Sequence, residues 1–224
     1  MITYTLTRSK RKTVALYVRN GNIEVRAPLK MPKSDIDKFV ASKEKWITDR
    51  LVKSQKQSEQ RESFELNYGD TVLYRGKNYP IIVKPGNRVG FDDTAFFMPP
   101  NLPAEQIKSA CVQVYRMLAK RVLTEKTLDF AKRMAVAPTA VKINGATTRW
   151  GSCSARKSIN YSWRLIMADD DVIDYVVVHE LAHLTEMNHS ARFWVIVGSV
   201  LSDYRERQKR LKELQEKLNI ENWE

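Results

Sequence analysis

The stretch HELAHLTEMNH, residues 179–189, contains all three histidines of a chain of 224 residues. His179 and His183 are four positions apart, so a helix would place both imidazoles on one face, one turn apart. Two imidazoles in this arrangement can hold a single metal ion. Glu180 points about 100° further round such a helix, where it can reach a water molecule bound to that metal. The stretch therefore predicts a metal site with an acidic side chain beside it.

The third ligand has to come from the residues that follow His183. Glu186 would stay on the same stripe of a continuing helix, but about 10 Å along the axis from His179. His189 would lie about 240° round the helix from His183, so it can reach the metal only if the chain turns first. We expect His189 to be the third ligand and keep Glu186 as the alternative.

Asn188 could make the required turn, because asparagine enters the left-handed region readily at the end of a helix. Ser190 could then cap a new helix over residues 191–201. Three imidazoles and one open water position are typical of a catalytic zinc site, whereas structural sites are closed by a fourth protein ligand. We therefore expect one Zn²⁺ per chain.

The histidine segment follows a run that predicts a buried helix. Residues 172–184 are apolar almost all round, and Asp169, Asp170 and Asp171 before them can supply an N-cap and favourable charge. Unsatisfied polar groups are costly in such a setting, and a metal would satisfy them. The alternative is that the histidines are satisfied core residues without a metal. Zinc would lower the pKa of a bound water towards ~7, and Glu180 would take its proton and pass it to the leaving group.

Composition limits the broad class of the protein. The chain has 43% hydrophobic and 29% charged residues, which is ordinary globular usage, and two cysteines make no disulfide framework, so we expect a cytoplasmic protein without a membrane segment. The net charge is +12, and residues 1–61 hold 15 Lys and Arg against 6 Asp and Glu. Two interpretations of this excess stay open: contact with DNA or another polyanion through the N-terminal part, or a plain solvated surface, which is the more common use of basic residues in strands and on a helix.

Periodicity and turn residues divide the chain near residue 100, where Pro99, Pro100 and Pro103 cluster. Strands are expected over 2–9, 13–19, 22–28, 70–86 and 89–99, with an Asn20-Gly21 hairpin turn and one helix over 32–57. After the prolines we expect a helix over 104–137, strands over 139–144 and 158–166 around a polar loop, and a charged helix over 204–218. Candidate core positions of the 104–137 helix are Ile107, Val114, Leu118, Val122, Leu128 and Phe130. The fold class is α+β, with a β-rich part over 1–100 and a catalytic part over 101–224.

At these residues the chain resembles the YgjP-like metallopeptidase domain family. The shared pattern runs through RWGSC (149–153), WRLI (163–166), the HELAHL segment from His179, and NHSARFW (188–194). The basic start over 8–28 and KEKWI (43–47) are also similar, so the resemblance covers nearly the whole chain. It implies a zincin-like fold related to the SprT and WLM peptidases, with zinc held by His179, His183 and His189 and with Glu180 as the catalytic glutamate.

The resemblance also places the loop with Arg149 and Ser152 near the active site, where the arginine could stabilise an oxyanion, grip a phosphate, or simply pair with a core carboxylate. Cys153 is expected to be a small buried thiol rather than a ligand. Strand 158–166 is expected to be the edge strand, to which a peptide can add. Of its residues, Arg164 is preferred to Tyr161 as a substrate contact.

Three functions stay open on these grounds. The leading hypothesis is a zinc-dependent hydrolase, most simply a peptidase acting on a peptide or protein. The first alternative is a metal-dependent UTP pyrophosphatase, although Mg²⁺ prefers oxygen ligands to imidazoles. The second is a nucleic-acid-binding protein with a structural zinc, which a fourth ligand such as Cys153 would favour.

Overall fold

The computed structural model of the protein describes residues 2–19 and 21–223. The chain forms two compact units, one up to Phe64 with Leu218–Asn222, and the other from Glu65 to Lys217 with Trp223. The boundary between the units thus follows Phe64, while the proline cluster near residue 100 lies inside the second unit. Helices and small sheets make up both units, so the fold is α+β.

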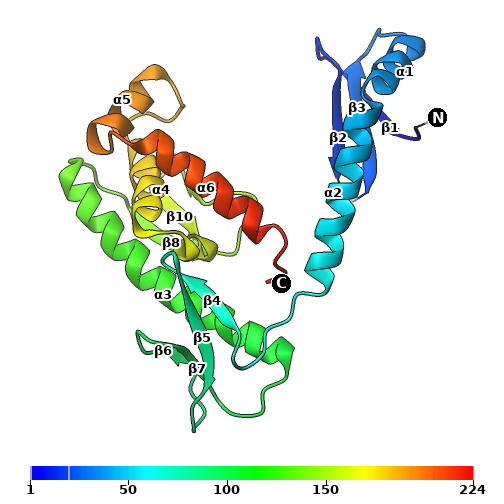
Figure 1. Ribbon diagram of the computed structural model, residues 1–224. Coiled ribbons are helices and arrows are strands. Elements are labelled where there is room, and N and C mark those ends of the chain that lie inside the picture. Colours follow the sequence, from blue (N-terminus) through cyan, green and yellow to red (C-terminus); the bar gives the residue numbers. More distant parts are fainter. Residues whose placement is uncertain (1, 20, 224) are drawn as a thin grey trace. The chain divides into compact units, whose positions relative to one another are not determined.

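The first unit is a three-stranded sheet with two helices on one face (Figure 1). Its strands are β1 (Thr5–Ser9), β2 (Ala15–Arg19) and β3 (Asn22–Pro28), in the order β1-β3-β2. β1 is parallel to β3 and β2 antiparallel to it. Gly21, in the turn between β2 and β3, has φ +73°. Asn20 of the expected turn lies outside the described residues.

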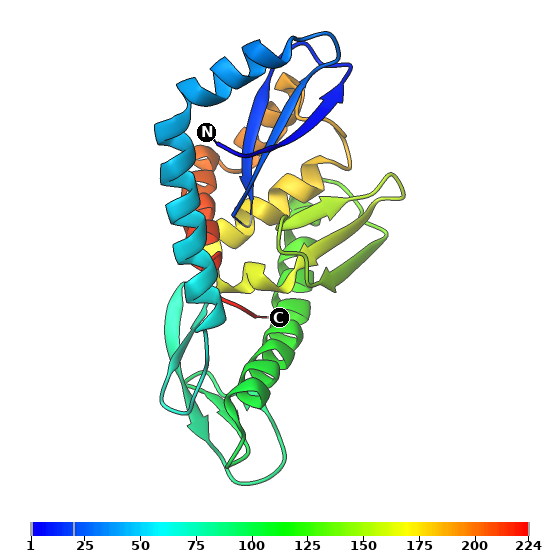
Figure 2. The same ribbon diagram turned by 90° about the vertical axis from the view of Figure 1, so that its right-hand side faces the viewer.

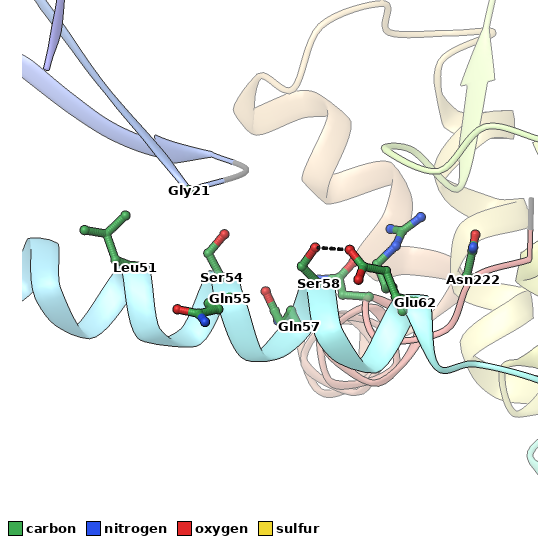
Figure 3. A pocket seen from close by; sticks show the side chains of 10 residues that line it. Gly21, Leu51, Ser54, Gln55, Gln57, Ser58, Glu62 and Asn222 are labelled. Carbon is green, nitrogen blue, oxygen red and sulfur yellow. Dashed lines mark hydrogen bonds between the residues drawn. The ribbon is translucent and has the colours of Figure 1, made fainter.

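The expected single helix over 32–57 is two helices, α1 (Lys33–Ser42) and α2 (Glu44–Glu62). Lys43 ends α1 with φ −108° and ψ 13°, which breaks the helical path, and its N–H donates to the carbonyls of Val40 and Ala41. Trp46 is exposed, but Ile47 is buried against the sheet. Further along α2 the side chains are mostly polar, and Ser58 donates a hydrogen bond to Glu62 Oε1 at 3.3 Å (Figure 3). The core of this unit is formed by Val25, Ala27, Ile36, Val40 and Ile47.

The second unit contains two sheets (Figure 1). The four-stranded sheet has the order β4-β5-β7-β6, made of β4 (Thr71–Tyr74), β5 (Lys77–Val83), β6 (Gly90–Phe91) and β7 (Phe96–Met98). The three-stranded sheet has the order β8-β10-β9, made of β8 (Ala140–Asn144), β9 (Gly151–Cys153) and β10 (Ser158–Ser162). β10 is parallel to β8 and antiparallel to β9.

Helix α3 (Ala104–Arg133) connects the two sheets and runs beside α4 (Asp170–Ala182) in both views (Figure 1; Figure 2). Five of its six expected core residues are buried or nearly so, as predicted. Leu128 is the exception, since 53% of it is exposed. Its neighbour Thr127 takes the buried place, with its hydroxyl bonded to Leu123 O and Tyr161 Oη.

Residues 163–166, expected as strand, form part of the 3₁₀ helix η1 (Trp163–Met167). Helices α4, α5 (Ala191–Val200) and α6 (Tyr204–Leu218) complete the unit.

Trp223 packs against two aromatic side chains of the second unit, with its ring 5.5 Å from that of Tyr115 and 5.9 Å from that of Trp163. Among the helices within 2–19 and 21–223, none combines the length and the apolar character needed to cross a bilayer.

Candidate metal centre

Helix α4 carries the first two predicted site residues, and its start is fixed by ion pairs. Asp169 takes the N-cap position, but its side chain makes no capping hydrogen bond. It accepts from Arg210 instead, and Arg75 pairs with Asp170. The expected cap is thus replaced by salt bridges, which still place negative charge at the positive end of the helix dipole.

His179 lies in the last turn of α4, and His183 follows the helix directly with φ −65° and ψ −16°. Because these angles are still helical, the two imidazoles keep the one-turn spacing that the sequence predicts. Their ring centroids are 5.0 Å apart.

The turn that brings the chain back differs from the expected one. Asn188 is not among the described residues with positive φ, so the prediction of a left-handed turn there was wrong. Its Oδ1 accepts the N–H of Ser190 at 3.0 Å, which closes an Asx turn without a left-handed residue. Ser190 then caps α5 as predicted, since its Oγ accepts the N–H of Phe193.

This turn brings His189 to the other two histidines. Its Nε2 lies 3.0 Å from Nε2 of His179, and one ring nitrogen from each histidine falls within 4.8 Å of the others. Phe193 packs against all three rings, with centroid distances between 4.6 and 4.9 Å. The two ends of the turn therefore converge on one point beside α4.

The hydrogen bonding around the rings fits a metal ion. Nδ1 of His183 lies 3.1 Å from Glu186 O, and because a carbonyl only accepts, this nitrogen carries the proton and leaves Nε2 free to ligate. Nδ1 of His179 is buried and has no partner in the part of the chain that the structure describes. Converging imidazoles with free lone pairs suit Zn²⁺ at Zn–N distances of about 2.0 Å. Glu186 contributes its carbonyl, while its carboxylate faces Arg192 at 3.8 Å.

Burial keeps the imidazoles of His179 and His183 neutral, as metal binding requires. It lowers the pKa of His179 to about 3, with smaller effects from the nearby His183 and His189. It also lowers the pKa of His183, against the opposing effect of the Glu186 carbonyl. Neither ring has to lose a proton at neutral pH before it ligates.

Glu180 belongs to α4 and is 5% exposed, because its side chain is covered by β9. Burial raises its pKa to about 8, and the positive charge of Arg149 partly offsets this effect. Its Oε2 has no hydrogen-bond partner among the described residues. Gly151 lies against the side chain so closely that a Cβ there would be 2.5 Å from Oε1. Sequence reasoning missed this role of Gly151, because the contact joins residues far apart in the chain.

The three predicted substrate contacts lie in different places. Arg149 is exposed and near enough to Glu180 to affect its pKa. Ser152 alternates along β9 with Gly151, which faces Glu180, so its side chain lies on the other face of the sheet. Arg164 is in η1, where its Nη1 donates to Gly145 O at 2.8 Å. Tyr161, the less preferred candidate, is fully buried.

The edge strand of this sheet is also not the expected one. β10 pairs with β8 on one side and β9 on the other, so it has no free edge. β9 is the edge strand that contacts α4. Sequence analysis read residues 147–157 as loop, because β9 is only three residues long and its pairing partner lies across a turn. Cys153 at its end is partly buried, with a thiol pKa raised by burial and by Glu180, and it is not part of the metal-binding group.

Converging imidazoles beside a buried glutamate define the class of metal-dependent hydrolases. The chain belongs to the YgjP-like metallopeptidase domain family, whose sequence profile matches residues 12–214. Two solved structures are similar. The metallopeptidase zymogen abylysin of Pyrococcus abyssi is 20% identical, with 45% of this chain and 98% of that chain covered and a TM-score of 0.39. The zymogen jannalysin of Methanocaldococcus jannaschii is 17% identical, with 42% and 95% covered and a TM-score of 0.37. No curated protein sequence matches significantly.

Proposed function

We propose that the protein is a zinc metallopeptidase in which His179, His183 and His189 hold the metal and Glu180 is the general base. The observation that carries this proposal is the convergence of three ring nitrogens within 4.8 Å, together with the buried carboxyl group of Glu180, the residue that follows the first histidine. Among the residues that the structure describes, no carboxylate or thiol joins that group, and imidazole ligands favour zinc over Mg²⁺.

Zinc at this position would supply a bound water of lowered pKa and would polarise the scissile carbonyl. Glu180 accepts the proton of the attacking water and delivers it to the leaving nitrogen. A carboxyl group whose pKa is raised by burial holds such a proton readily, and a nearby cation brings the pKa back towards the working pH. Arg149 is that cation, and it can also stabilise the oxyanion.

A peptide is the substrate that suits the surroundings of the site best. Within residues 2–19 and 21–223, β9 is an edge strand next to α4, and an extended peptide can add to such an edge by main-chain hydrogen bonds. Two alternatives have less support. A pyrophosphatase would use Mg²⁺ or a similar ion, which prefers oxygen ligands to imidazoles. A structural zinc would need a fourth ligand, whereas the Cys153 thiol donates to Ser154 O.

The decisive experiment combines metal content with hydrolysis. Purified wild type should contain one zinc by elemental analysis, and His179→Ala and His189→Ala should lose it. Glu180→Gln should keep the zinc and lose hydrolysis of an unstructured protein such as casein. The control is Glu186→Gln, which changes a nearby carboxylate outside the proposed ligand set and should keep both properties. A wild-type protein that takes up no zinc, or a Glu180→Gln variant with full activity, would overturn the proposal.

A further inference from the structure

A pocket of about 190 Å³ opens beside Glu180. Three parts of the second unit line it. Helix α4 contributes Tyr175, Val176, His179 and Glu180, the start of β9 contributes Gly151 with the preceding Trp150, and α6 contributes Leu211.

The walls of this pocket are mostly apolar apart from the two site residues and the polar atoms of Trp150 and Tyr175. Tyr175 and Val176 are each 3% exposed, and Leu211 is 9% exposed. Val176 and Tyr175 lie one turn before Glu180 and His179, so the pocket extends from the site along α4. Neither lysine nor arginine is among the lining residues that the structure describes. Such a lining suits a hydrocarbon group and not a phosphate.

The size of the pocket matches one side chain. Its volume is below the range of roughly 300–1,000 Å³ that takes a whole drug-sized ligand. It equals the share of about six water molecules in the liquid, at ~30 Å³ each. A branched aliphatic side chain, with four carbon atoms, fits within such a space.

The far wall is fixed by the ion pairs of α6. Arg210, next to Leu211, bonds to both Asp169 and Asp171 at the start of α4. Arg207 adds a hydrogen bond from Nη1 to Asp171 O at 2.9 Å. Because both arginines grip the helix that carries Glu180, Leu211 is held at a set position opposite Val176.

We propose that this pocket binds one aliphatic side chain of the peptide substrate, next to the scissile bond, and that Leu211 sets its size limit. The inference rests on the peptidase function proposed above. When the scissile carbonyl of a peptide reaches the three histidines, the side chains next to the scissile bond lie about 3.5 Å away along the peptide. The pocket lies at that range because Glu180 belongs both to its wall and to the reaction.

The test is a cleavage profile of the full-length, zinc-loaded protein. A library of peptides from a digested bacterial proteome is incubated with enzyme, and new termini are read by mass spectrometry. Wild type should show an excess of Val, Leu, Ile or Met at one position beside the cut. Leu211→Ala removes the far wall, so the ratio of kcat/KM for Phe over Val at that position should rise about tenfold or more. Leu211→Phe should shift the preference the other way, to Ala and Gly.

The matched control is Leu214→Ala, which shortens the same residue type on α6 but lines a different hollow, with Asp169 and Arg210. It should leave the profile unchanged. If Leu211→Ala proves too unstable to purify, the Leu211→Phe profile decides. Cleavage by wild type without side-chain preference beside the cut, or an unshifted profile in both Leu211 variants, overturns the inference alone. A zinc-loaded wild type that cuts no peptide overturns the proposed function, and the inference falls with it.

Discussion

Glu180 must be reached by a water molecule and yet be kept out of bulk solvent. The same burial that raises its pKa to about 8 lowers that of His179 to about 3, because each charged form is poorly solvated there. In the folded, metal-free protein the carboxyl group is therefore protonated at neutral pH and the imidazole is not. A bound cation would reverse the first state and preserve the second.

In the metal-free protein, these two shifts change the unfolding free energy in opposite directions as the pH rises. Between about 4.5 and 8 the folded state keeps a proton on Glu180 that the unfolded chain has lost, so stability falls as the pH rises. Between about 3 and 6.5 the unfolded chain holds a proton on His179 that the folded state lacks, so stability rises with pH. The two effects offset each other from about 4.5 to 6.5, and above 6.5 only the loss from Glu180 remains.

Chelator-treated wild type should therefore become less stable between pH 6.5 and about 8.5. Its unfolding free energy should fall by about 2 kcal/mol more than that of Glu180→Gln over the same interval. Urea unfolding followed by circular dichroism at the two pH values measures the difference. The glutamine cannot ionise, so its curve reports all other groups. Equal losses in the two proteins would show that the carboxyl group titrates normally.

Gly151 is the residue whose substitution should act on Glu180 without touching a ligand. A Cβ at Gly151 would lie 2.5 Å from Oε1 and 2.7 Å from Cγ of Glu180, so the carboxyl group of Gly151→Ala must move. Misplacement of a catalytic group by about 1 Å costs about a hundredfold in rate, so kcat should fall by about that factor while zinc content stays at one. Gly198→Ala is the control, because its Cβ would meet only Tyr204 at 3.6 Å, an ordinary contact. Unchanged kcat in Gly151→Ala would place the working position of Glu180 elsewhere.

At the scale of elements, the hairpin between β4 and β5 fixes the start of α4. Its turn residues Arg75 and Gly76 have φ +48° and +75°, the signs of a type I′ turn. Their N–H groups donate to Ile166 O at 2.9 Å and Met167 O at 3.2 Å, which ends η1, and the Arg75 side chain pairs with Asp170. The hairpin thereby satisfies the carbonyls that η1 leaves unpaired just before α4 begins.

Gly76→Ala should destabilise the protein through this docking. The new Cβ would fall 1.7 Å from Asp169 Oδ1 and 3.2 Å from its Cα, in addition to the cost of a positive φ. We expect a loss of about 3 kcal/mol in thermal or urea unfolding. Gly69→Ala is the matched control, since it has φ +91° but open space around the Cβ, and should lose only about 1 kcal/mol. Equal losses would mean that the contact with Asp169 adjusts freely.

Local patterns predicted most elements and the histidine cluster, because periodicity, caps and turns act over a few residues. The spacing of His179 and His183 survives since helical angles continue to His183, and Ser190 caps α5 as its position suggests. The sequence did not reveal the order β8-β10-β9, the wall formed by Leu211, or the contact of Gly151 with Glu180. These features depend on pairings across long stretches of chain. The prediction that Leu128 is a core residue was wrong for the same reason, because the face that α3 buries changes along the helix as its neighbours change.

At the scale of the whole molecule, positive charge is concentrated in the first unit. Residues 1–61 hold an excess of 9 positive charges out of the total of +12. Arg8 is used internally, since its Nη1 donates to the carbonyls of Pro28, Leu29 and Met31. On the sheet face away from the helices, Arg19 and Arg26 lie over the ring of Tyr17 at 5.2 and 4.9 Å. Arg26 is also paired with Glu24, whereas Arg19 is exposed. An exposed cation beside an aromatic ring, with Lys10 and Lys12 nearby in the sequence, is a surface to which single-stranded nucleic acid can bind by charge and stacking.

We therefore predict salt-dependent binding of the full chain to a labelled single-stranded oligonucleotide, measured by fluorescence anisotropy. Each phosphate contact releases counterions, so the dissociation constant should rise at least about tenfold between roughly 50 and 200 mM salt. Charge reversal to Glu at three exposed positions of the first unit should abolish most of this binding, the positions being Lys10, Lys12 and Arg19. The control variant carries the same charge reversal at three exposed positions of α3 in the second unit, Lys120, Arg121 and Lys132. Its net charge equals that of the first variant. Equal weakening by both sets would mean that only net charge attracts the strand, and no binding at low salt would remove nucleic acid as a partner of this surface.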